Sequence, residues 1–212
     1  MVGLVLASML AQVAEVPYVP SSPIVVEAML KLAAVRKGDV VYDLGCGDGR
    51  IVIMAARKFG ARGVGVDIDP ARIVEADRNA RAAGVSAAVK FFVRDVYDTD
   101  VHEATVVTLY MLADINRALR PTLLKQLAVG SRIVSHTFDM DDWKPDKTIL
   151  VGRERVYLWI VTEKAKLELV GEKRRDVGYR AAWRSLFEEP SGEEARVQDR
   201  VGQMAVDLHL GW

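Results

Sequence analysis

The stretch Val40-Val-Tyr-Asp-Leu-Gly-Cys-Gly-Asp-Gly-Arg-Ile51 decides the fold of this chain. It opens with a short apolar run, which is typical of a strand that is buried on both faces of a parallel sheet. Glycines at positions 45, 47 and 49 end the run, and a helix is predicted from about Asp48. Glycine tolerates a positive φ and lets the backbone approach a ligand closely. Because ligands of open α/β sheets bind beyond the carboxyl ends of the strands, this turn is the predicted ligand site.

The spacing of the glycines bears on which ligand the turn binds. The dinucleotide fingerprint is G-x-G-x-x-G, whereas counting from Gly45 places Arg50 at the third glycine. Charge also disfavours a pyrophosphate: a helix N-terminus attracts anions, but Asp43 and Asp48 already place carboxylates around this turn. A ligand with a ribose, an ammonium and a sulfonium, and without a phosphate, fits better. The predicted ligand is therefore S-adenosylmethionine.

The segment Asp43-Leu-Gly-Cys-Gly-Asp-Gly49 resembles the first motif of class I methyltransferases. Together with Pro17-Tyr-Val-Pro-Ser-Ser-Pro23, it resembles the seven-β-strand protein-lysine methyltransferases, which include archaeal broad-specificity enzymes and mitochondrial enzymes that modify ATP synthase subunit c. The resemblance covers roughly residues 16–162. It implies an α/β fold: a Rossmann-like, doubly wound and mostly parallel sheet of seven strands, with an antiparallel strand near the C-terminal end of the sheet.

The second predicted strand, Gly63-Val-Gly-Val-Asp-Ile-Asp-Pro70, ends in acidic residues. Asp67 lies eighteen positions beyond Gly49, close to the offset of about 20 residues at which an acid meets a ribose diol. A carboxylate can accept hydrogen bonds from both hydroxyls of the diol. The alternative is that Asp69 caps the following helix and that Asp67 has no binding role.

The third predicted strand, residues 89–95, also ends in an acid. Asp95 is predicted to accept from the adenine amino group, with the Val96 amide near a ring nitrogen; a solvated turn acid is the alternative. Cys46, inside the glycine loop, is also open to interpretation as a small apolar filler. The predicted residues of the methyl-donor site are Asp43, Gly45, Cys46, Gly47, Asp67, Ile68, Asp95 and Val96.

The exit of the fourth predicted strand, residues 104–112, bears on the methyl acceptor. Methyltransferases that act on nucleic-acid bases often carry Asn-Pro-Pro-Tyr or Asp-Pro-Pro-Tyr there, and the sequence Thr108-Leu-Tyr-Met-Leu112 argues against base methylation. Tyr110 remains at the acceptor position, where its ring could hold an ammonium by a cation–π contact. The resemblance adds Tyr18 as a residue of the channel for an incoming amine. Tyr110 and Tyr18 are thus the two predicted catalytic residues. The alternatives are that Tyr110 packs in the core and that the segment around Tyr18 serves only as a rigid lead-in.

Methyl transfer depends mainly on the alignment of the acceptor with the methyl group. It is an in-line displacement at a sulfonium, and good alignment is worth ~7–11 kcal/mol of the barrier. A lysine amine, with an ordinary pKa of about 10.4, must attack in its neutral form, and desolvation beside a sulfonium lowers its pKa without a strong general base. The predicted function is methylation of lysine side chains in proteins. A small-molecule methyltransferase, a binding protein without catalysis and a nicotinamide-dependent oxidoreductase, disfavoured by the glycine spacing, are the alternatives.

Composition limits the class of protein further. The formal net charge of zero gives no overall basic footprint for nucleic acid. The single cysteine excludes an internal disulfide and a cysteine-based metal site. The acids at 139, 141 and 142 favour a solvated loop that faces a cationic substrate over a metal site. His136, at a strand end, is expected to be hydrogen-bonded structure rather than a base. The sequence does not indicate an oligomeric state.

Three segments are predicted: an apolar stretch at 1–16, the methyltransferase domain at 17–162, and an extension of unknown role at 163–212. The first segment is shorter than the ~20 residues of a membrane span and lacks the basic start of a signal peptide. A packed helix and a cytoplasmic location are therefore expected, with export or peripheral membrane association as alternatives.

The rest of the domain is predicted as helices and strands in alternation. A helix over residues 114–127 should kink or split at Pro121, because proline removes a helical hydrogen bond. A hairpin around Gly152 should close the sheet with an antiparallel strand. Further along, Leu167, Leu169 and Val170 suggest a short strand.

Overall fold

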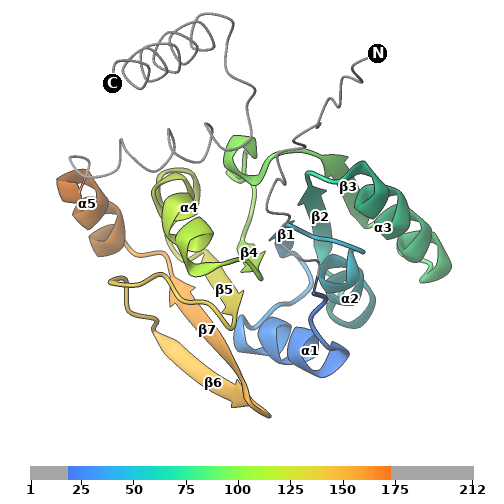
Figure 1. Cartoon of the computed structure of the whole chain (residues 1–212), viewed down its shortest axis with the longest axis horizontal. Coiled ribbons are helices and arrows are strands. Elements are labelled where there is room, and N and C mark those ends of the chain that lie inside the picture. The colour runs from blue at the N-terminus through green and yellow to red at the C-terminus, as the bar shows by residue number, and fades with distance from the viewer. Residues whose placement is uncertain (1–18, 173–212) are drawn as a thin grey trace, which may run out of the picture. The chain divides into compact units, whose positions relative to one another are not determined.

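The computed structural model describes residues 19–172 of the 212. Its elements, in chain order, are α1 (Pro23–Leu32), β1 (Val40–Leu44), α2 (Arg50–Phe59), β2 (Arg62–Asp67), α3 (Pro70–Ala82), β3 (Val89–Val93), the 3₁₀ turn η1 (Val96–Asp98), β4 (Val106–Leu109), α4 (Ala113–Gln126), β5 (Arg132–His136), β6 (Lys147–Val151), β7 (Glu154–Ile160) and α5 (Glu163–Glu172). Strands and helices alternate through most of this order (Figure 1). The predictions for Tyr18, for residues 1–16 and for residues 173–212 fall outside the described residues.

Seven strands form one sheet in the order β3-β2-β1-β4-β5-β7-β6. The pairs β1–β2, β2–β3, β1–β4 and β4–β5 are parallel, whereas β7 runs antiparallel to both of its neighbours. The predicted fold and the predicted hairpin are thereby confirmed. The order of the strands reverses between β1 and β4, and in doubly wound sheets a ligand binds at the carboxyl edge of such a switch point. The glycine loop that follows β1 lies at that edge.

Helices cover both faces of the sheet. On β5, the Ser135 hydroxyl accepts from Asn116 of α4, while the His136 ring contacts Ser21, just before α1. Because neighbouring side chains in a strand point to opposite faces, α1 and α4 lie on opposite faces. Helices α1, α2 and α3 contact one another in turn, and α4 contacts α5 (Figure 1). This is the doubly wound arrangement.

Glycines in β2 let α2 and β3 pack tightly around the start of the sheet. A Cβ at Gly63 would lie 2.7 Å from the Cβ of Val52 in α2, and one at Gly65 would lie 2.6 Å from the Phe91 ring. Both distances are shorter than real Cβ contacts, so these positions need glycine for close packing rather than for a special φ. The tight packing fixes the end of β2, which carries the predicted ribose acid.

Of the two outcomes predicted at Pro121, a kink or a split, the split is wrong, because α4 runs as one helix across Pro121. Its buried residues lie on both sides of the proline and include Leu119, Leu123 and Leu124. Burying a leucine side chain is worth about 1.5–3 kcal/mol, and an interior proline costs about 3 kcal/mol. The packing of several leucines therefore outweighs the local cost of the proline.

The prediction of a strand at Leu167, Leu169 and Val170 is wrong, because these residues belong to helix α5. The Thr162 hydroxyl accepts from the Ala165 amide at 3.1 Å, which caps the start of the helix. Ala165 is buried, and α5 packs beside α4. Throughout residues 19–172, helices fall short of the length and apolar character that crossing a bilayer requires.

Candidate functional site

The loop after β1 is held against the end of β2 by backbone hydrogen bonds. The amides of Gly45 and Cys46 both donate to the Val66 carbonyl at 2.9 Å. The glycines at 45, 47 and 49 have φ values of 78°, 51° and 78°, in the left-handed region that favours glycine. Gly49 is the N-cap of α2. The loop is thus a preformed turn between a strand and a helix N-terminus.

Gly45 leaves its backbone exposed beside Met111 at the switch point. A Cβ added at Gly45 would lie 3.4 Å from the sulfur of Met111, which follows β4. The exposed glycine backbone and the methionine therefore face each other across the point where the strand order reverses. A side chain at position 45 would cover this backbone, so glycine here suits a ligand that lies directly on the backbone.

Asp67 lies at the end of β2, where the sequence predicts the ribose acid. One carboxylate oxygen accepts from the Gly47 amide at 2.8 Å and the other from the Asp69 amide at 3.0 Å. Asp69 in turn caps α3 by accepting from the Ala71 amide at 2.8 Å. Both acids therefore have structural partners. Each oxygen of Asp67 keeps a lone pair that can accept from a hydroxyl.

Asp43 is a buried acid beneath the glycine loop. Its side chain accepts a hydrogen bond of 2.7 Å from the hydroxyl of Thr108, a β4 residue that the sequence analysis did not assign to the site. Burial raises the pKa of Asp43 to about 7; the Thr108 hydrogen bond opposes this rise, and the nearby charges of Asp67 and Asp48 add to it. A cation bound at this loop would favour the ionised carboxylate.

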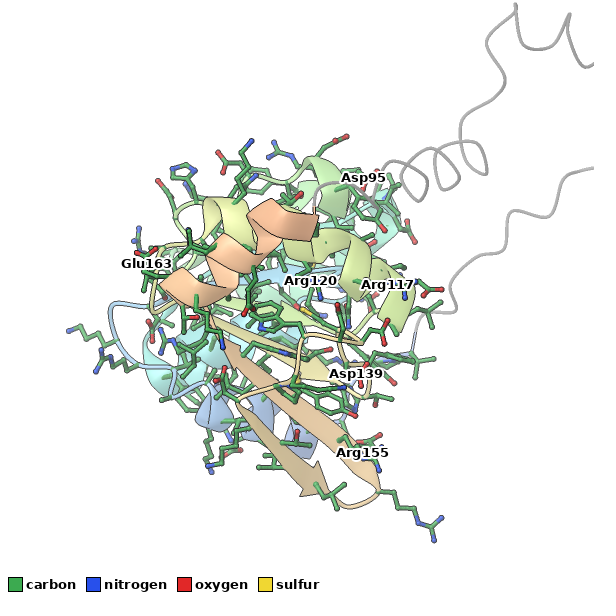
Figure 2. All side chains as sticks on the ribbon, turned by 90° about the vertical axis from the view of Figure 1, so that its left-hand side faces the viewer. Asp95, Arg117, Arg120, Asp139, Arg155 and Glu163 are labelled. Carbon is green, nitrogen blue, oxygen red and sulfur yellow. The ribbon has the colours of Figure 1, made fainter. Side chains whose placement is uncertain are left out.

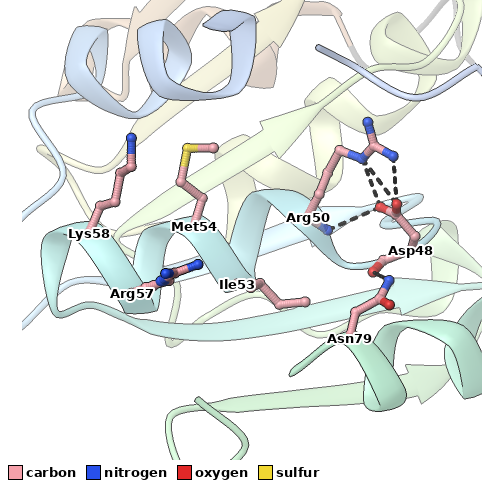
Figure 3. A pocket seen from close by; sticks show the side chains of 7 residues that line it. All are labelled: Asp48, Arg50, Ile53, Met54, Arg57, Lys58 and Asn79. Atoms are coloured by element: carbon pink, nitrogen blue, oxygen red, sulfur yellow. Dashed lines mark hydrogen bonds and ion pairs between the residues drawn. The ribbon is translucent and has the colours of Figure 1, made fainter. Parts of the chain in front are cut away.

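Asp48 is not a free charge of the loop. Its carboxylate forms an ion pair with Arg50 at 2.6 Å, and its carbonyl accepts from Asn79 at 3.0 Å (Figure 3). Arg50 also donates to the Ser21 carbonyl at 2.8 Å. The repulsion of anions that the sequence suggested for Asp48 is therefore weakened by Arg50. These contacts instead tie the glycine loop to the segment that precedes α1.

A separate hollow of about 230 Å³ runs along the outer side of α2 (Figure 3). Its lining residues are Asp48, Arg50, Ile53, Met54, Arg57, Lys58 and Asn79. It begins near the glycine loop and continues to the C-terminal end of α2, away from the carboxyl edge of the sheet.

The residues predicted to contact adenine, Asp95 and Val96, follow β3, and Ile68, another predicted donor-site residue, follows β2. Asp95 is half-buried and accepts from the Tyr97 amide at 2.8 Å, so it caps the turn η1. This contact agrees with the alternative of a turn acid and leaves the second carboxylate oxygen available. Val96 is half-buried, and Ile68, next to Asp67, is 72% exposed. An apolar side chain that is this exposed offers a surface for a flat ring.

Cys46 fills space inside the loop rather than facing solvent. It is buried, and a Cβ on Gly65 would lie 2.8 Å from its sulfur. Burial raises the pKa of this thiol, which therefore stays protonated. Its side chain supports the loop as an apolar filler, which leaves its backbone as the part that could face a ligand.

Aromatic rings gather where β4 and β5 end. The half-buried Tyr110 ring lies 4.0 Å from the His136 ring, centroid to centroid, and 6.2 Å from the Phe138 ring. The Nδ1 of His136 lies 2.8 Å from the Ser21 hydroxyl, which confirms the expectation of hydrogen-bonded structure. Burial lowers the pKa of His136, and the Glu154 carboxylate opposes that change. Sequence reasoning missed Ser21 and Phe138 as neighbours of this cluster.

The loop after β5 is fastened to α4. Arg117 pairs with Asp141 at 3.1 Å and Arg120 pairs with Asp142. Figure 2 shows both arginines on α4 beside the loop that carries Asp139. Two of the three clustered acids are thus neutralised by arginines, which reduces the acidic surface that the sequence suggested.

Comparisons with known proteins agree with this geometry. Residues 43–147 match the family model described as the ANTKMT methyltransferase domain. The chain is 42% identical over 159 residues to a protein-lysine N-methyltransferase of Saccharolobus islandicus, covering 73% of this chain and 99% of that protein. It is 34% identical to the mouse adenine nucleotide translocase lysine N-methyltransferase, covering 69% of this chain and 64% of that one.

One solved structure that is similar to this chain contains the product of the methyl donor, and its description names a different methyl acceptor. It is described as an RNA methyltransferase of Salinibacter ruber in complex with S-adenosyl-L-homocysteine. It is 52% identical to this chain with a TM-score of 0.68, and the match covers 68% of this chain and 95% of that one.

Proposed function

The chain belongs to the family of S-adenosylmethionine-dependent protein-lysine N-methyltransferases, and from that premise we propose that it methylates the side-chain amine of lysine in a protein substrate. One observation in the site supports this acceptor most directly. Tyr110, flanked by two further rings, directly precedes Met111, which faces the glycine loop. An aromatic face beside the methyl-donor loop suits an amine, because ring faces attract cations and desolvate them.

S-adenosylmethionine is the methyl donor, and it supplies an electrophilic methyl group on a sulfonium. We assign the ribose to Asp67, whose oxygens keep free lone pairs, and the adenine ring to Ile68, Asp95 and Val96. The backbone of Gly45, Cys46 and Gly47 forms the floor of the site. Asp43 lies below it as the acid that a positive charge would ionise. The fit is good because these residues offer glycine backbone, carboxylates and exposed apolar surface, which match a donor without phosphates.

The residues of the chain act on the acceptor by position and by desolvation. An amine that enters between aromatic rings loses water, which lowers its pKa and favours the neutral, nucleophilic form. We assign Tyr110 to the wall of this channel, and from the family resemblance we propose Tyr18 as a second channel residue. No strong base is needed, because the alignment of the amine with the methyl group supplies much of the rate.

RNA is the second candidate acceptor, because the 52% identical structure is described as an RNA methyltransferase. Two features of this chain count against RNA. The exit of β4 lacks the Asn-Pro-Pro-Tyr or Asp-Pro-Pro-Tyr sequence of base methyltransferases, and the formal net charge is zero. Proteins that bind nucleic acid generally present a basic face. We therefore favour a protein acceptor, and the labelling experiment that follows distinguishes it from RNA.

The test is incubation of the purified full chain with S-adenosylmethionine that carries a labelled methyl group and with a cell extract. Samples are treated with ribonuclease or with protease and then resolved on a gel. We expect label that survives ribonuclease and yields methyl-lysine on hydrolysis. Asp67→Asn should abolish it, whereas Asp77→Asn, an exposed acid of α3, should not. Label that only ribonuclease removes would replace lysine by RNA as the acceptor.

We also propose that the enzyme works in the cytoplasm, where its methyl donor is available. Fractionation of cells that express the full chain, followed by immunodetection, tests this location. Recovery in the membrane or in the exported fraction would contradict it and would direct attention to residues 1–16.

A further inference from the structure

The His136 side chain contacts both flanks of the acceptor region. On one side its ring lies 4.0 Å from Tyr110, at an interplanar angle of 35°. On the other side its Nδ1 lies 2.8 Å from the hydroxyl of Ser21, which is 115 positions away in the sequence. The histidine is 1% exposed and cannot reach an acceptor that remains in solvent.

Ser21 is a fixed point of the segment that leads into α1. It is 4% exposed, and its carbonyl accepts from Arg50 at 2.8 Å. The adjacent Ser22 caps α1 by accepting from the Val25 amide. The lead-in is therefore held from three sides: by α1 itself, by the methyl-donor loop through Arg50, and by β5 through His136.

The surroundings of the ring select one tautomer. The Nε2 atom has no hydrogen-bond partner among residues 19–172, but the Glu154 carboxylate of β7 lies 3.5 Å from it. A carboxylate only accepts, so Glu154 favours the proton on Nε2. Nδ1 then carries the lone pair, and the Ser21 hydroxyl donates to it. The neutral ring thus links Ser21 and Tyr110 without adding a positive charge beside the expected amine.

We propose that His136 is a positioning residue of the acceptor site, which fixes Tyr110 through its ring and the lead-in segment through Nδ1. It acts through these two partners and does not touch the acceptor or the methyl donor. The inference rests on the proposed function in one respect, the placement of Tyr110 at the acceptor.

Two substitutions separate the two contacts. His136→Phe keeps a ring against Tyr110 and removes the Nδ1 acceptor. His136→Asn keeps a polar atom near the position of Nδ1 and removes the ring. Ser21→Ala removes the same hydrogen bond from the other partner, and Ser86→Ala, at an exposed serine, is the matched control. Each variant is assayed for acceptor KM, kcat and the Kd of S-adenosylhomocysteine by calorimetry.

We expect Ser21→Ala and His136→Phe each to raise the acceptor KM about 3–10-fold, as the loss of one hydrogen bond of about 0.5–1.5 kcal/mol implies. The Kd of S-adenosylhomocysteine should change less than twofold. Ser21→Ala should have no further effect in the His136→Phe background, because both remove one bond, but should still act in the His136→Asn background.

Three outcomes would overturn the inference. The first is an unchanged acceptor KM in Ser21→Ala, which decides the matter even if the His136 variants fail to fold. The second is a loss of S-adenosylhomocysteine affinity in step with the loss of kcat/KM, as for a purely structural histidine. The third is full additivity of Ser21→Ala and His136→Phe. If the wild type labels RNA and not lysine, the proposed function fails, and the inference about His136 is then tested by measuring the KM of the same variants for RNA. If the wild type labels nothing, the proposed function and the inference about His136 both fail.

Discussion

Asp43 illustrates how one residue couples the fold to the ligand. It is a carboxyl group that is 2% exposed, with the Thr108 hydroxyl as a hydrogen-bond partner. Burial disfavours its ionised form more than this single hydrogen bond favours it, so its pKa rises to about 7. The folded chain without ligand therefore holds an acid that is poised between its two forms near neutral pH. A positively charged ligand is the natural counterpart of that acid.

The raised pKa of Asp43 predicts a pH dependence of stability. Unfolding returns the group to its ordinary pKa of about 3.9, so the folded state binds the extra proton between about pH 4 and about pH 7. Within that window the group's contribution to the unfolding free energy falls as the pH rises, by at most ~1.4 kcal/mol per pH unit, and it is lost above the folded pKa. Asp43→Asn should remove this slope.

Urea unfolding of the wild type and of Asp43→Asn at pH 5, 6, 7 and 8 measures the difference. Comparing the two proteins cancels the pH dependence of stability that comes from other acids, such as Asp39, whose pKa is lowered beside Arg132. Asp77→Asn is the matched control on the surface. Parallel curves for the wild type and Asp43→Asn would show that burial does not hold the proton on Asp43.

Tyr110 carries the second prediction at the scale of the residue. Tyr110→Ala removes the ring that we assign to the acceptor channel, and cation–π contacts are worth about 0.5–2 kcal/mol. We expect kcat/KM for the protein acceptor to fall about 3–30-fold, while Tyr110→Phe keeps most of the activity. Calorimetry should give the same Kd for S-adenosylhomocysteine in all three proteins. Unchanged turnover in Tyr110→Ala would remove this residue from the mechanism.

At the scale of the element, Gly49 joins the glycine loop to α2 under two separate constraints. Its φ of +78° disfavours a side chain, and a Cβ there would lie 2.7 Å from the Phe91 ring and 2.9 Å from the Cβ of Ala76. Gly84, after α3, has a similar φ of +70° with no atom within 4 Å of an added Cβ. Comparing substitutions at Gly49 and Gly84 therefore separates the destabilisation caused by the backbone conformation from the destabilisation caused by the steric clash.

Gly84→Ala should lower the unfolding free energy by about 1–2 kcal/mol, the cost of a left-handed conformation. Gly49→Ala should lower it by a further ~1–3 kcal/mol because of overpacking, and it should weaken binding of S-adenosylhomocysteine. Urea unfolding and calorimetry on both variants give the two quantities. Equal destabilisation by the two substitutions would mean that α2 moves freely away from β3.

Pro121 is the second feature at the scale of the element. It lies in the interior of α4, with buried leucines before and after it. Replacing an interior proline restores a backbone hydrogen bond and relieves a clash that together cost ~3 kcal/mol. Pro121→Ala should therefore raise the urea midpoint by the equivalent of about 1–3 kcal/mol, with unchanged kcat. A lower midpoint would show that the proline is preferred where it stands, through the restricted unfolded chain.

The elements also show how far the sequence alone can go. The alternation of apolar runs, glycines and acids predicted individual strands and the residues at the ends of β1, β2 and β3, because each pattern is local, whereas the seven-stranded sheet was implied by the family resemblance. The helix at 163–172 was missed, since three apolar residues carry too little information to separate strand from helix. The contacts of Ser21 with His136 and of Thr108 with Asp43 span 115 and 65 positions. Such contacts form only in the folded arrangement, so no local sequence pattern predicts them.

At the scale of the whole molecule, the residues that we assign to the methyl donor come from segments that are far apart in the sequence. Asp43, Asp67 and Asp95 lie at the carboxyl ends of three adjacent strands, and Arg50 links the loop to the lead-in of α1. A ligand held by these groups binds the folded chain and not the unfolded one. At 100 times its Kd it should add about 2.7 kcal/mol to the unfolding free energy.

This linkage gives the last prediction. For a domain of about 150–250 residues, 1 kcal/mol shifts Tm by about 2–4 °C, so saturating S-adenosylhomocysteine should raise Tm by roughly 5–10 °C. Asp67→Asn should lose most of the shift, whereas Ser21→Ala should keep it, because Ser21 serves the acceptor side. NADH should give no shift, since the glycine spacing and the carboxylates disfavour a pyrophosphate. A shift with NADH and none with S-adenosylhomocysteine would contradict the assignment of the donor site, because a ligand raises Tm only if it binds the folded chain.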